Sequence, residues 1–473
     1  MSEPEPASPR VLRVVHVAAE YADVAYTGGL GEAIAGLARA TARTGANVSV
    51  VIPGYERAFA ALGGDTLPIG EVEVALPWGP CAFAVHRVVR DGVAIFLMRE
   101  AAYFDRPHLY GDASAPYSDN AVRFAAFARA AAQVVDGADV VHLHDWHAGL
   151  VAPLLARTWS RPEPRPRIVT TAHNIAFHGA FPTSALALTG LGPDVLSVDG
   201  VLHHGRINLL KAGLQFADFL TTVSPTHAEE LKTEAGGWDL AGLFRHRQRD
   251  LVGILNGTDA PREAVTPAER TARRAALCAE LGVETPTGPL FALVSHLTTQ
   301  KGVDLLIEVI PGLVERGAGF VVLGLGAPAL TEALRSVART SPRVAFCERF
   351  DPALAQRIYE AADVICAPSR FEPCGSSQLH AMCAGALPLA RATGGLADTV
   401  KDVRDGGWGF VFGPPEAGAL ADACERALSL FGDDAAWQAA VDRARGVPPT
   451  WDVAAASYVA LYERLLGRPG AEG

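Results

Sequence analysis

Glu372 stands in a loop whose composition suits the recognition of a sugar. The loop follows an apolar, strand-like run at 362–367 and precedes a helix-like run at 379–385. A carboxylate placed there can accept hydrogen bonds from sugar hydroxyls, and small residues behind it leave backbone N–H groups for an anion at the positive end of the helix. These small residues are Cys374, Gly375, Ser376 and Ser377. For Glu and Gly alone, the alternative is an ordinary βα loop with a solvated carboxylate.

A lysine and a histidine open the second half of the chain in a similar setting. Lys301 lies between a strand-like run at 291–295 and a helix-like run at 303–314. Its mobile point charge can meet a diphosphate there, although an isolated lysine is more often a surface residue. His296 stands at the start of the same loop.

Histidines gather at two further junctions between strand and loop. His142 and His144 alternate along one strand-like run and therefore share a face, while His147 lies in the following turn. A zinc site would need a fourth ligand and an acidic partner, which are not obvious, so we expect no metal. The second junction holds Asn174 and His173, for which a structural histidine is the alternative.

A glycine-rich loop follows the first strand-like run. It contains Tyr26, Gly28 and Gly29, and its glycines allow the backbone to approach a phosphate closely. Its spacing is not GxGxxG, and no acidic residue closes the next strand at 51–53. We therefore do not expect a dinucleotide-binding site.

These loops recur in a cycle of strand, turn and helix, which predicts parallel sheets with ligands at the carboxyl ends of the strands. The cycle restarts after a segment rich in Pro, Ala, Glu and Arg, so we expect two α/β domains. The expected parts are a first domain at 11–259, a linker region at 260–289 with a short helix at 267–281, a second domain at 290–450, and a helix at 451–466.

The composition excludes several classes of protein. A chain of 473 residues is too long for one core, and its net charge of −11 disfavours nucleic acid and anionic membranes as partners. The seven cysteines form no CxxC pair, which argues against a disulfide framework and a zinc ribbon. We do not expect the polar, Pro-rich start to be a signal peptide, and no apolar run of the sequence is long enough to span a membrane. We expect a cytoplasmic protein.

Taken together, these strings resemble the bacterial glycogen synthases and starch synthases. The resemblance runs through ordered blocks from 11 to 466, including the nucleotide-sugar signature at 368–378 and the string His-Asp-Trp-His-Ala at 144–148. Two cations of the family pattern are replaced. Tyr26 stands in place of Lys in the first glycine-rich loop, and His296 stands in place of Arg in the loop of Lys301.

The resemblance implies an α/β fold of the GT-B type, with two Rossmann-like domains facing each other across a deep cleft and a C-terminal helix crossing back to the first domain. It implies retaining transfer of glucose from ADP-glucose to the non-reducing end of an α-1,4-glucan, with no cofactor and no metal. The implied catalytic residues are Glu372, His173, Lys301 and Asp145. The implied binding residues are Gly28, Gly29, Tyr26, Asn174, Asn256, His296, Lys301, Phe350, Cys374, Gly375, Ser376 and Ser377, with Phe350 stacking on the adenine ring.

The two replaced cations leave alternatives open. The chain is an active synthase, a transferase with a shifted donor or acceptor, or a catalytically silent homologue that binds glucan. The sequence does not decide between ADP and UDP donors, nor does it give the oligomeric state.

Overall fold

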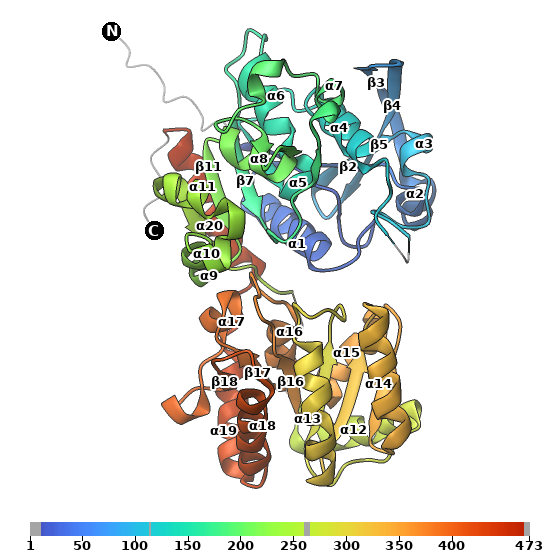
Figure 1. Ribbon diagram of the computed structural model, residues 1–473, viewed down its shortest axis with the longest axis vertical. Coiled ribbons are helices and arrows are strands. Elements are labelled where there is room, and N and C mark those ends of the chain that lie inside the picture. Colours follow the sequence, from blue (N-terminus) through green and yellow to red (C-terminus); the bar gives the residue numbers. More distant parts are fainter. Residues whose placement is uncertain (1–10, 113–114, 260–264, 468–473) are drawn as a thin grey trace, which may run out of the picture. The chain divides into compact units, whose positions relative to one another are not determined.

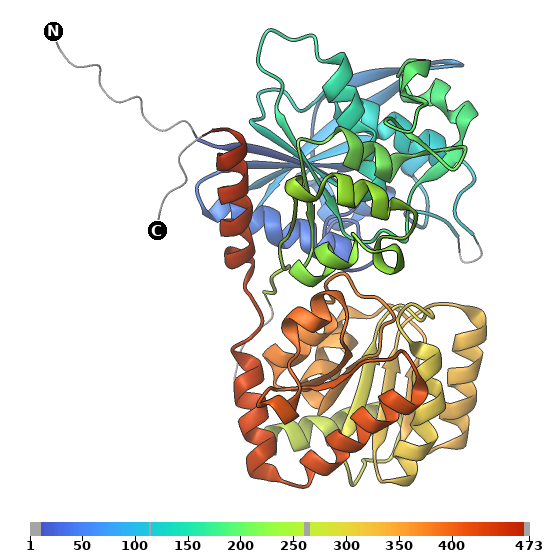
Figure 2. The same cartoon turned by 60° about the vertical axis from the view of Figure 1, so that its left-hand side comes forward.

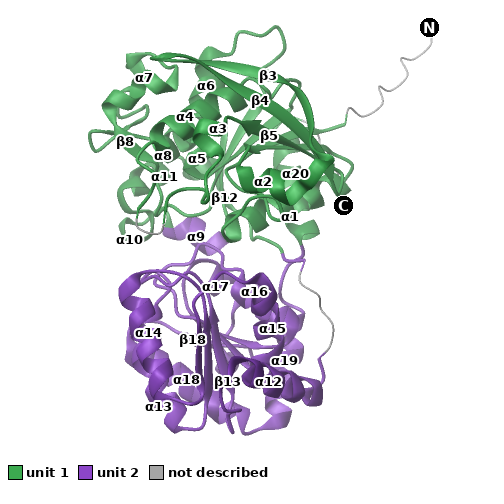
Figure 3. Cartoon of the chain, turned by 90° about the vertical axis from the view of Figure 1, so that its right-hand side faces the viewer, with its two compact units in different colours: residues 1–223, 231–257, 451–473 green, residues 224–230, 258–450 purple. Residues whose placement is uncertain are grey.

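The computed structural model describes residues 11–112, 115–259 and 265–467, which form two compact units (Figures 1 and 3). Unit 1 comprises the described residues of 1–223, 231–257 and 451–473. Unit 2 comprises the described residues of 224–230 and 258–450. Among the described residues, no helix is long and apolar enough to cross a membrane. The seven cysteines all lie within the described residues, and none forms a disulfide.

Unit 1 is built on one mixed sheet, whose order among the described strands is β12-β11-β7-β6-β1-β2-β5-β4-β3. The strands from β12 to β5 run parallel, and β3 and β4 add an antiparallel edge after β5. Their bounds are β1 Arg13–Val17, β2 Asn47–Pro53, β3 Leu67–Leu76, β4 Gly79–Arg90, β5 Val93–Arg99, β6 Val140–His144, β7 Arg167–Ala172, β11 Phe219–Thr222 and β12 Leu251–Gly253. The central strand β6 is buried along its whole length, as expected for a parallel strand covered on both faces.

Unit 2 is built on an all-parallel sheet of order β15-β14-β13-β16-β17-β18. Its strands are β13 Leu290–Val294, β14 Gly319–Leu323, β15 Val344–Cys347, β16 Val364–Ala367, β17 Leu387–Arg391 and β18 Phe410–Phe412. Its helices include α12 Pro267–Leu281, α13 Val303–Glu315, α14 Pro328–Thr340, α15 Pro352–Ala361, α16 Ser377–Ala384, α17 Gly394–Thr399, α18 Ala417–Phe431 and α19 Asp434–Arg445. The predicted alternation of strands and helices is confirmed in both units.

The C-terminal helix α20 (Trp451–Leu465) packs in unit 1, as the sequence predicts (Figure 2). It lies on α1 (Gly29–Arg43), where Gly36 makes the close approach possible. A Cβ atom at Gly36 would lie 2.2 Å from the ring of Trp451. Tyr458 and Tyr462 of the same helix are buried against the sheet in this cluster.

The sequence misplaced the segment 224–230, which it assigned to the first domain. This segment carries the short helix α9 (Pro225–Glu230) and belongs to unit 2. Thr226 donates two hydrogen bonds to the carboxylate of Asp398, at 2.9 Å from its backbone nitrogen and 2.6 Å from its hydroxyl. Glu230 accepts a hydrogen bond of 2.9 Å from the backbone of Gly394. These polar contacts with the start and middle of α17 do not affect the hydrophobic periodicity of the sequence. Periodicity therefore could not predict that the segment 224–230 packs in unit 2.

The short helix expected at 267–281 is confirmed as α12, but it packs as part of unit 2 rather than standing in a linker. The guanidinium of Arg270 donates to the carbonyl oxygen of Ala362 at 2.6 Å and to that of Ala384. Leu277 and Cys278 are buried in a core cluster with residues of β13–β16 and α15. Residues 260–264 of the expected linker lie outside the described residues.

Candidate active site

Each sheet reverses its strand order beside its first strand. In unit 1, β1 lies between β2 and β6, and in unit 2, β13 lies between β14 and β16. In open α/β sheets, a reversal of this kind leaves a crevice at the carboxyl ends of the two central strands, where ligands bind. The loops that follow these strands are 18–28 and the start of α5 (Asp145–Gly149) in unit 1, and 295–302 and 368–376 in unit 2. Tyr26, Gly28 and Asp145 in unit 1, and His296, Lys301, Glu372 and residues 374–376 in unit 2, follow these central strands. The other predicted residues, which include His173, Asn174, Asn256 and Phe350, follow neighbouring or edge strands.

In unit 2, the loops after β13 and β16 bring Lys301 and Glu372 into contact. The Lys301 Nζ atom lies 2.5 Å from Glu372 Oε2, and the hydroxyl of Ser369 donates to the same oxygen at 2.9 Å. Glu372 is only 7% exposed, so its carboxylate is held inside the loop by an ion pair and a hydroxyl donor. The sequence assigned these two residues to different parts of the donor, and the structure shows that they are direct partners.

The backbone behind Glu372 is fixed by a close approach of α17. The amide of Gly395 donates to the carbonyl oxygen of Glu372 at 3.1 Å. Gly394 has a φ of 43°, and a Cβ atom there would lie 2.0 Å from the same carbonyl oxygen. Glycine is required at this position by both its conformation and its lack of space. The glycine-rich block at 393–400 thus orients the carboxylate, a role that the sequence did not predict.

The first turn of α16 lies next to the end of β13. Cys374 is buried, Gly375 has a φ of 77°, and Ser376 is the N-cap residue of α16. The hydroxyl of Ser377 donates to the carbonyl oxygen of Val294 at 2.9 Å, which ties the helix start to β13. The helix N-terminus therefore lies beside the strand-order reversal, where its backbone amides can bind an anion.

His296 and Phe350 are the two exposed members of the unit 2 set. The side chain of His296 is exposed overall, but part of its ring is shielded from water by the surrounding loop. This loss of solvation, followed by the neighbouring Lys301 ammonium, lowers the pKa of His296 from its usual value. Its ring is therefore neutral at pH 7, unlike the arginine of the family pattern. Phe350 follows β15, and its side chain is 55% exposed.

In unit 1, Asp145 begins α5 directly after β6 and has a φ of 56°. Its Oδ1 atom accepts hydrogen bonds from the backbone nitrogens of His173 at 2.7 Å and Asn174 at 3.4 Å. Burial raises the pKa of Asp145 to about 7, although these hydrogen bonds oppose the shift. Asp145 thus joins the ends of β6 and β7. The side-chain oxygen of Asn174 accepts a hydrogen bond of 3.0 Å from the backbone nitrogen of Ala176, which closes a local turn.

The ring of His173 ends a chain of three imidazoles. His173 Nε2 lies 2.9 Å from His144 Nδ1, and His144 Nε2 lies 3.0 Å from His16 Nδ1 on the neighbouring strand β1. Burial lowers the pKa of His16 and of His173 to about 3 and that of His144 well below its usual value. All three rings are therefore neutral, and the chain fixes the orientation of His173. The role of His16 was not predicted from the sequence, because His16 lies in an apolar run that reads as an ordinary buried strand.

His142 and His144 share a face, as the sequence predicts, with ring centroids 4.2 Å apart. His147 lies in α5 after the strand and stacks on Trp146, with ring centroids 3.9 Å apart. His16 joins the first two histidines, and one nitrogen of each of His16, His142 and His144 lies within 4.8 Å of the others. The nitrogens of His142 are used by Tyr462 at 2.7 Å and by the hydroxyl of Thr171 at 2.6 Å. This trio is a hydrogen-bonded core of neutral rings.

Glu20 is a buried carboxylate that was not predicted from the sequence as a site residue. It accepts hydrogen bonds from the Thr27 backbone at 2.7 Å, the Thr27 hydroxyl at 3.0 Å and the Tyr110 hydroxyl at 2.6 Å. Glu20 is 3% exposed, and burial raises its pKa. The signal that was available is an acidic residue at the end of an apolar strand run. Glu20 anchors the glycine-rich loop ahead of α1.

The remaining predicted residues of unit 1 lie in that loop and after β12. Tyr26 is half-buried. A Cβ atom at Gly31 would lie only 2.4 Å from the Cβ atom of Tyr26 and would clash with it. Gly28 precedes α1, and Gly29 is exposed at its start. Asn256 follows β12 and belongs to unit 1 rather than to the unit of Lys301 and Glu372.

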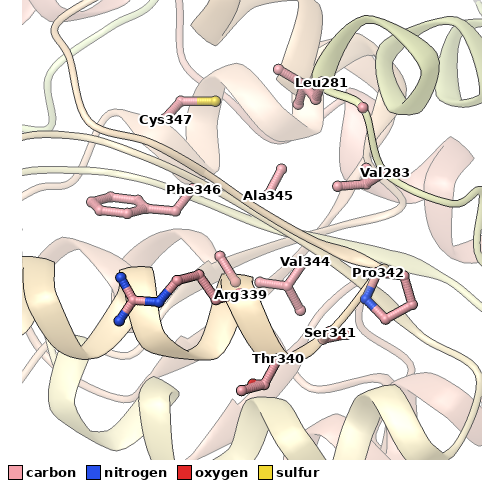
Figure 4. A pocket seen from close by; sticks show the side chains of 12 residues that line it. Leu281, Val283, Arg339, Thr340, Ser341, Pro342, Val344, Ala345, Phe346 and Cys347 are labelled. Carbon is pink, nitrogen blue, oxygen red and sulfur yellow. The ribbon is translucent and has the colours of Figure 1, made fainter.

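A hollow of about 490 Å³ lies elsewhere in unit 2, against the edge strand β15 (Figure 4). It is lined by the residues that follow α12 and by the end of α14. Of the described residues that line it, none is a predicted site residue. The hollow is therefore separate from the site at the strand-order reversal.

Comparisons with known proteins agree with this arrangement. Residues 13–246 match the family model "Starch synthase catalytic domain", and residues 288–429 match "Glycosyl transferases group 1". Glycogen synthases of Granulibacter bethesdensis and Jannaschia sp. are 39% and 40% identical, over 96% and 95% of this chain and 99% and 98% of their own lengths.

Two solved structures are also similar to this chain. The catalytic domain of starch synthase IV from Arabidopsis thaliana, bound to ADP and acarbose, is 30% identical with a TM-score of 0.90 and covers 97% of this chain and 100% of that one. A sucrose-phosphate synthase from Thermosynechococcus elongatus, 18% identical over 96% of this chain and 99% of its own with a TM-score of 0.63, shares the fold alone. The GT-B fold class predicted from the sequence is confirmed.

Proposed function

The chain belongs to the family of glycogen and starch synthases, and we propose that it transfers glucose from ADP-glucose to the non-reducing end of an α-1,4-glucan. The names of its relatives support the reaction, and the ADP and acarbose bound to the starch synthase IV domain support a nucleotide donor and a glucan acceptor. In this reaction the bond between the glucose C1 and the diphosphate breaks, a bond from C1 to the acceptor 4-oxygen forms as that hydroxyl loses its proton, and ADP and the proton are released.

The observation that carries the proposal is the contact of Lys301 with Glu372 at the strand-order reversal of unit 2. We assign the donor to this unit. The Lys301 ammonium and the amides at the start of α16 would hold the diphosphate, and the Glu372 carboxylate would accept hydrogen bonds from glucose hydroxyls. Phe350, with its exposed ring, would stack on the adenine.

The leaving diphosphate gains negative charge as its bond to C1 breaks. In this proposal, protein donors stabilise that charge without a metal, and removal of one such donor commonly costs about 10²–10³ in turnover. Lys301 is the cation that remains from the family pattern, because Tyr26 and His296 replace the other two. The product would retain the configuration at C1, as the resemblance implies.

We assign the sugar-contacting polar groups of unit 1 to His173, Asn174 and Asp145. The His173 ring is neutral and fixed by His144, so it offers an orienting contact rather than a charge. The Asn174 side-chain oxygen is used in its own turn, which leaves its amide N–H₂ to donate to a sugar hydroxyl. Seven cysteines without a disulfide support a reducing compartment, and we place the protein in the cytoplasm.

The replaced cations favour one alternative, a transferase with a shifted donor. The experiment measures glucose incorporation into glycogen from ADP-glucose, UDP-glucose and other sugar nucleotides, for the parent and for Glu372→Gln, which keeps the shape of the side chain. Activity that is highest with ADP-glucose and lost in Glu372→Gln supports the proposal. Activity with another donor alone would establish the alternative, and binding of glycogen without transfer from any donor would establish a silent homologue.

A further inference from the structure

A second cluster of histidines lies on the surface of unit 1, away from the imidazole chain. His203 ends β9 (Leu202–His203), and His204 follows in the turn before β10 (Arg206–Asn208). Asp239 lies in the short 3₁₀ helix η4 (Trp238–Leu240). One ligand atom from each of the three side chains lies within 4.8 Å of the other two. None of them belongs to the candidate active site.

The spacing of this cluster suits a metal ion. Two ligands at about 2.0–2.1 Å from a tetrahedral zinc ion lie about 3.3 Å apart. His204 Nε2 lies 3.4 Å from Asp239 Oδ2. A surface ion pair would account for this contact alone, but it would not account for the convergence of His203 on the same point.

A fourth imidazole stands beside the cluster. The ring centroids of His178 and His203 are 6.0 Å apart, and those of His203 and His204 are 4.3 Å apart. His178 hydrogen-bonds to the backbone of Ile175, the kind of outer contact that orients a ligating imidazole. Within the described part of the chain, the Nε2 atoms of His178 and His203 are buried and have no hydrogen-bond partner. A buried imidazole nitrogen without a partner is an available ligand atom.

The buried trio of His16, His142 and His144 provides a useful contrast. Both ring nitrogens of His142 and of His144 already have hydrogen-bond partners, and all three side chains are 0% exposed. A metal ion would have to break these bonds inside the core. At the surface cluster, by contrast, His204 and Asp239 are exposed, so an ion can enter from solvent.

The cluster also combines the two kinds of ligand atom that such an ion uses. His203 and His204 offer imidazole nitrogens, and the Asp239 carboxylate adds an oxygen ligand and a negative charge.

We propose that His203, His204 and Asp239, beside the imidazole of His178, form a binding site for Zn²⁺ or a similar divalent transition-metal ion. Imidazole and carboxylate ligands suit ions of this class, whereas Mg²⁺ and Ca²⁺ prefer sets made of oxygen alone. A bound ion would tie the β9–β10 hairpin to the segment 231–257. The site is independent of the proposed transferase function.

The test uses the full chain without a polyhistidine tag, stripped with a chelator and titrated with Zn²⁺ alone in a calorimeter. The parent should bind a single high-affinity ion per chain, which raises its melting temperature, and Mg²⁺ should not bind. The double variant His203→Gln/His204→Gln and the single variant Asp239→Asn should each bind Zn²⁺ at least about tenfold more weakly, because loss of an outer partner alone costs about that much. His246→Gln, at an exposed histidine that ends α11 (Ala241–His246), is the matched control and should bind as the parent does.

Circular dichroism and melting of the metal-free proteins establish that the variants are folded, since the substituted side chains lie at or near the surface. Absence of saturable Zn²⁺ binding by the parent would overturn the proposal. So would binding of parental affinity in both His203→Gln/His204→Gln and Asp239→Asn, or an equal loss in the His246→Gln control, which would indicate nonspecific binding to histidines.

Discussion

The two strand-order reversals hold their buried carboxylates in different ways. In unit 2, the carboxylate of Glu372 forms an ion pair with the ammonium of Lys301. In unit 1, Glu20 and Asp145 have no ion-pair partner among the described residues and are held by hydroxyl and backbone N–H donors. Their surroundings also include neutral imidazoles, and the pKa of each carboxyl group is raised by burial.

This difference indicates what each unit can recognise. A cation and a helix N-terminus, as in unit 2, favour the binding of an anion such as a diphosphate. A set of uncharged or weakly charged hydrogen-bonding groups, as in unit 1, suits the hydroxyl groups of a neutral glucan. The comparison predicts that substitutions in the two units will affect different properties of the enzyme.

The largest effect is expected from Glu372→Ala. Transfer from the best donor should fall by at least about 10²-fold, comparable with the loss of a transition-state contact. The variant also leaves the ammonium of Lys301 without its partner, so we expect a stability loss on the order of 1–3 kcal/mol. Turnover in the glycogen assay and urea unfolding measure the two effects. Glu372→Gln is the control for the space left by the side chain, and near-parental turnover in either variant would exclude Glu372 from the sugar site.

Asp145→Asn should separate activity from stability in unit 1. The raised pKa of Asp145 means that the folded state binds a proton more tightly than the unfolded state does. The parent therefore loses stability as the pH rises from about 4 to about 7, by up to roughly 4 kcal/mol at 1.4 kcal/mol per unit. Asparagine tolerates the positive φ at this position and can accept the same backbone hydrogen bonds.

We therefore expect Asp145→Asn to be more stable than the parent at pH 8 and equally stable near pH 4, while its transfer rate falls by about tenfold. Urea unfolding of both proteins across this pH range measures the difference. An identical pH dependence in the two proteins would mean that Asp145 is ionised in the folded state without penalty.

Restoring the cations of the family pattern should have a smaller effect. Tyr26→Lys combined with His296→Arg adds two charges, and recovery of about 1.4 kcal/mol of stabilisation corresponds to about a tenfold gain in turnover with ADP-glucose. Tyr26→Phe with His296→Gln is the neutral control. If the cationic double variant is no faster than the parent, the absence of these two cations does not limit transfer from ADP-glucose.

The smallest effect concerns His296 and pH. The pKa of His296 is lowered in the free protein, so the ring must gain a proton before it can pair with a phosphate. ADP should therefore bind more weakly as the pH rises between this lowered pKa and the higher pKa of the complex, by at most about tenfold per pH unit for one proton. His296→Arg should remove this dependence, and His296→Gln should weaken binding on the acidic side. Parallel curves for the three proteins would show that His296 does not contact the phosphates.

The sequence was sufficient to place single residues at strand ends, because strand runs and glycine-rich turns are local signals. Lys301, Glu372, Asp145 and His173 all follow strands as predicted. The pairing of Lys301 with Glu372 was not predictable in the same way, because it depends on β13 and β16 being neighbours in the sheet. That order is a property of the whole fold.

Other misses have similar causes. His16 and Glu20 lie in an apolar run that reads as an ordinary buried strand, and their polar partners come from other elements. The segment 224–230 joins unit 2 through side-chain hydrogen bonds, which leave no trace in hydrophobic periodicity.

The most direct test of the difference between the units is the dissociation constant of ADP, measured by calorimetry at pH 7 for Lys301→Gln and Asp145→Asn. If unit 2 recognises the anion through Lys301, Lys301→Gln should bind ADP at least about tenfold more weakly than the parent, because a hydrogen bond to a charged group is worth about 1.5–3 kcal/mol. Asp145→Asn should bind ADP with the affinity of the parent. Parental affinity in Lys301→Gln, or an equal loss in Asp145→Asn, would contradict the account.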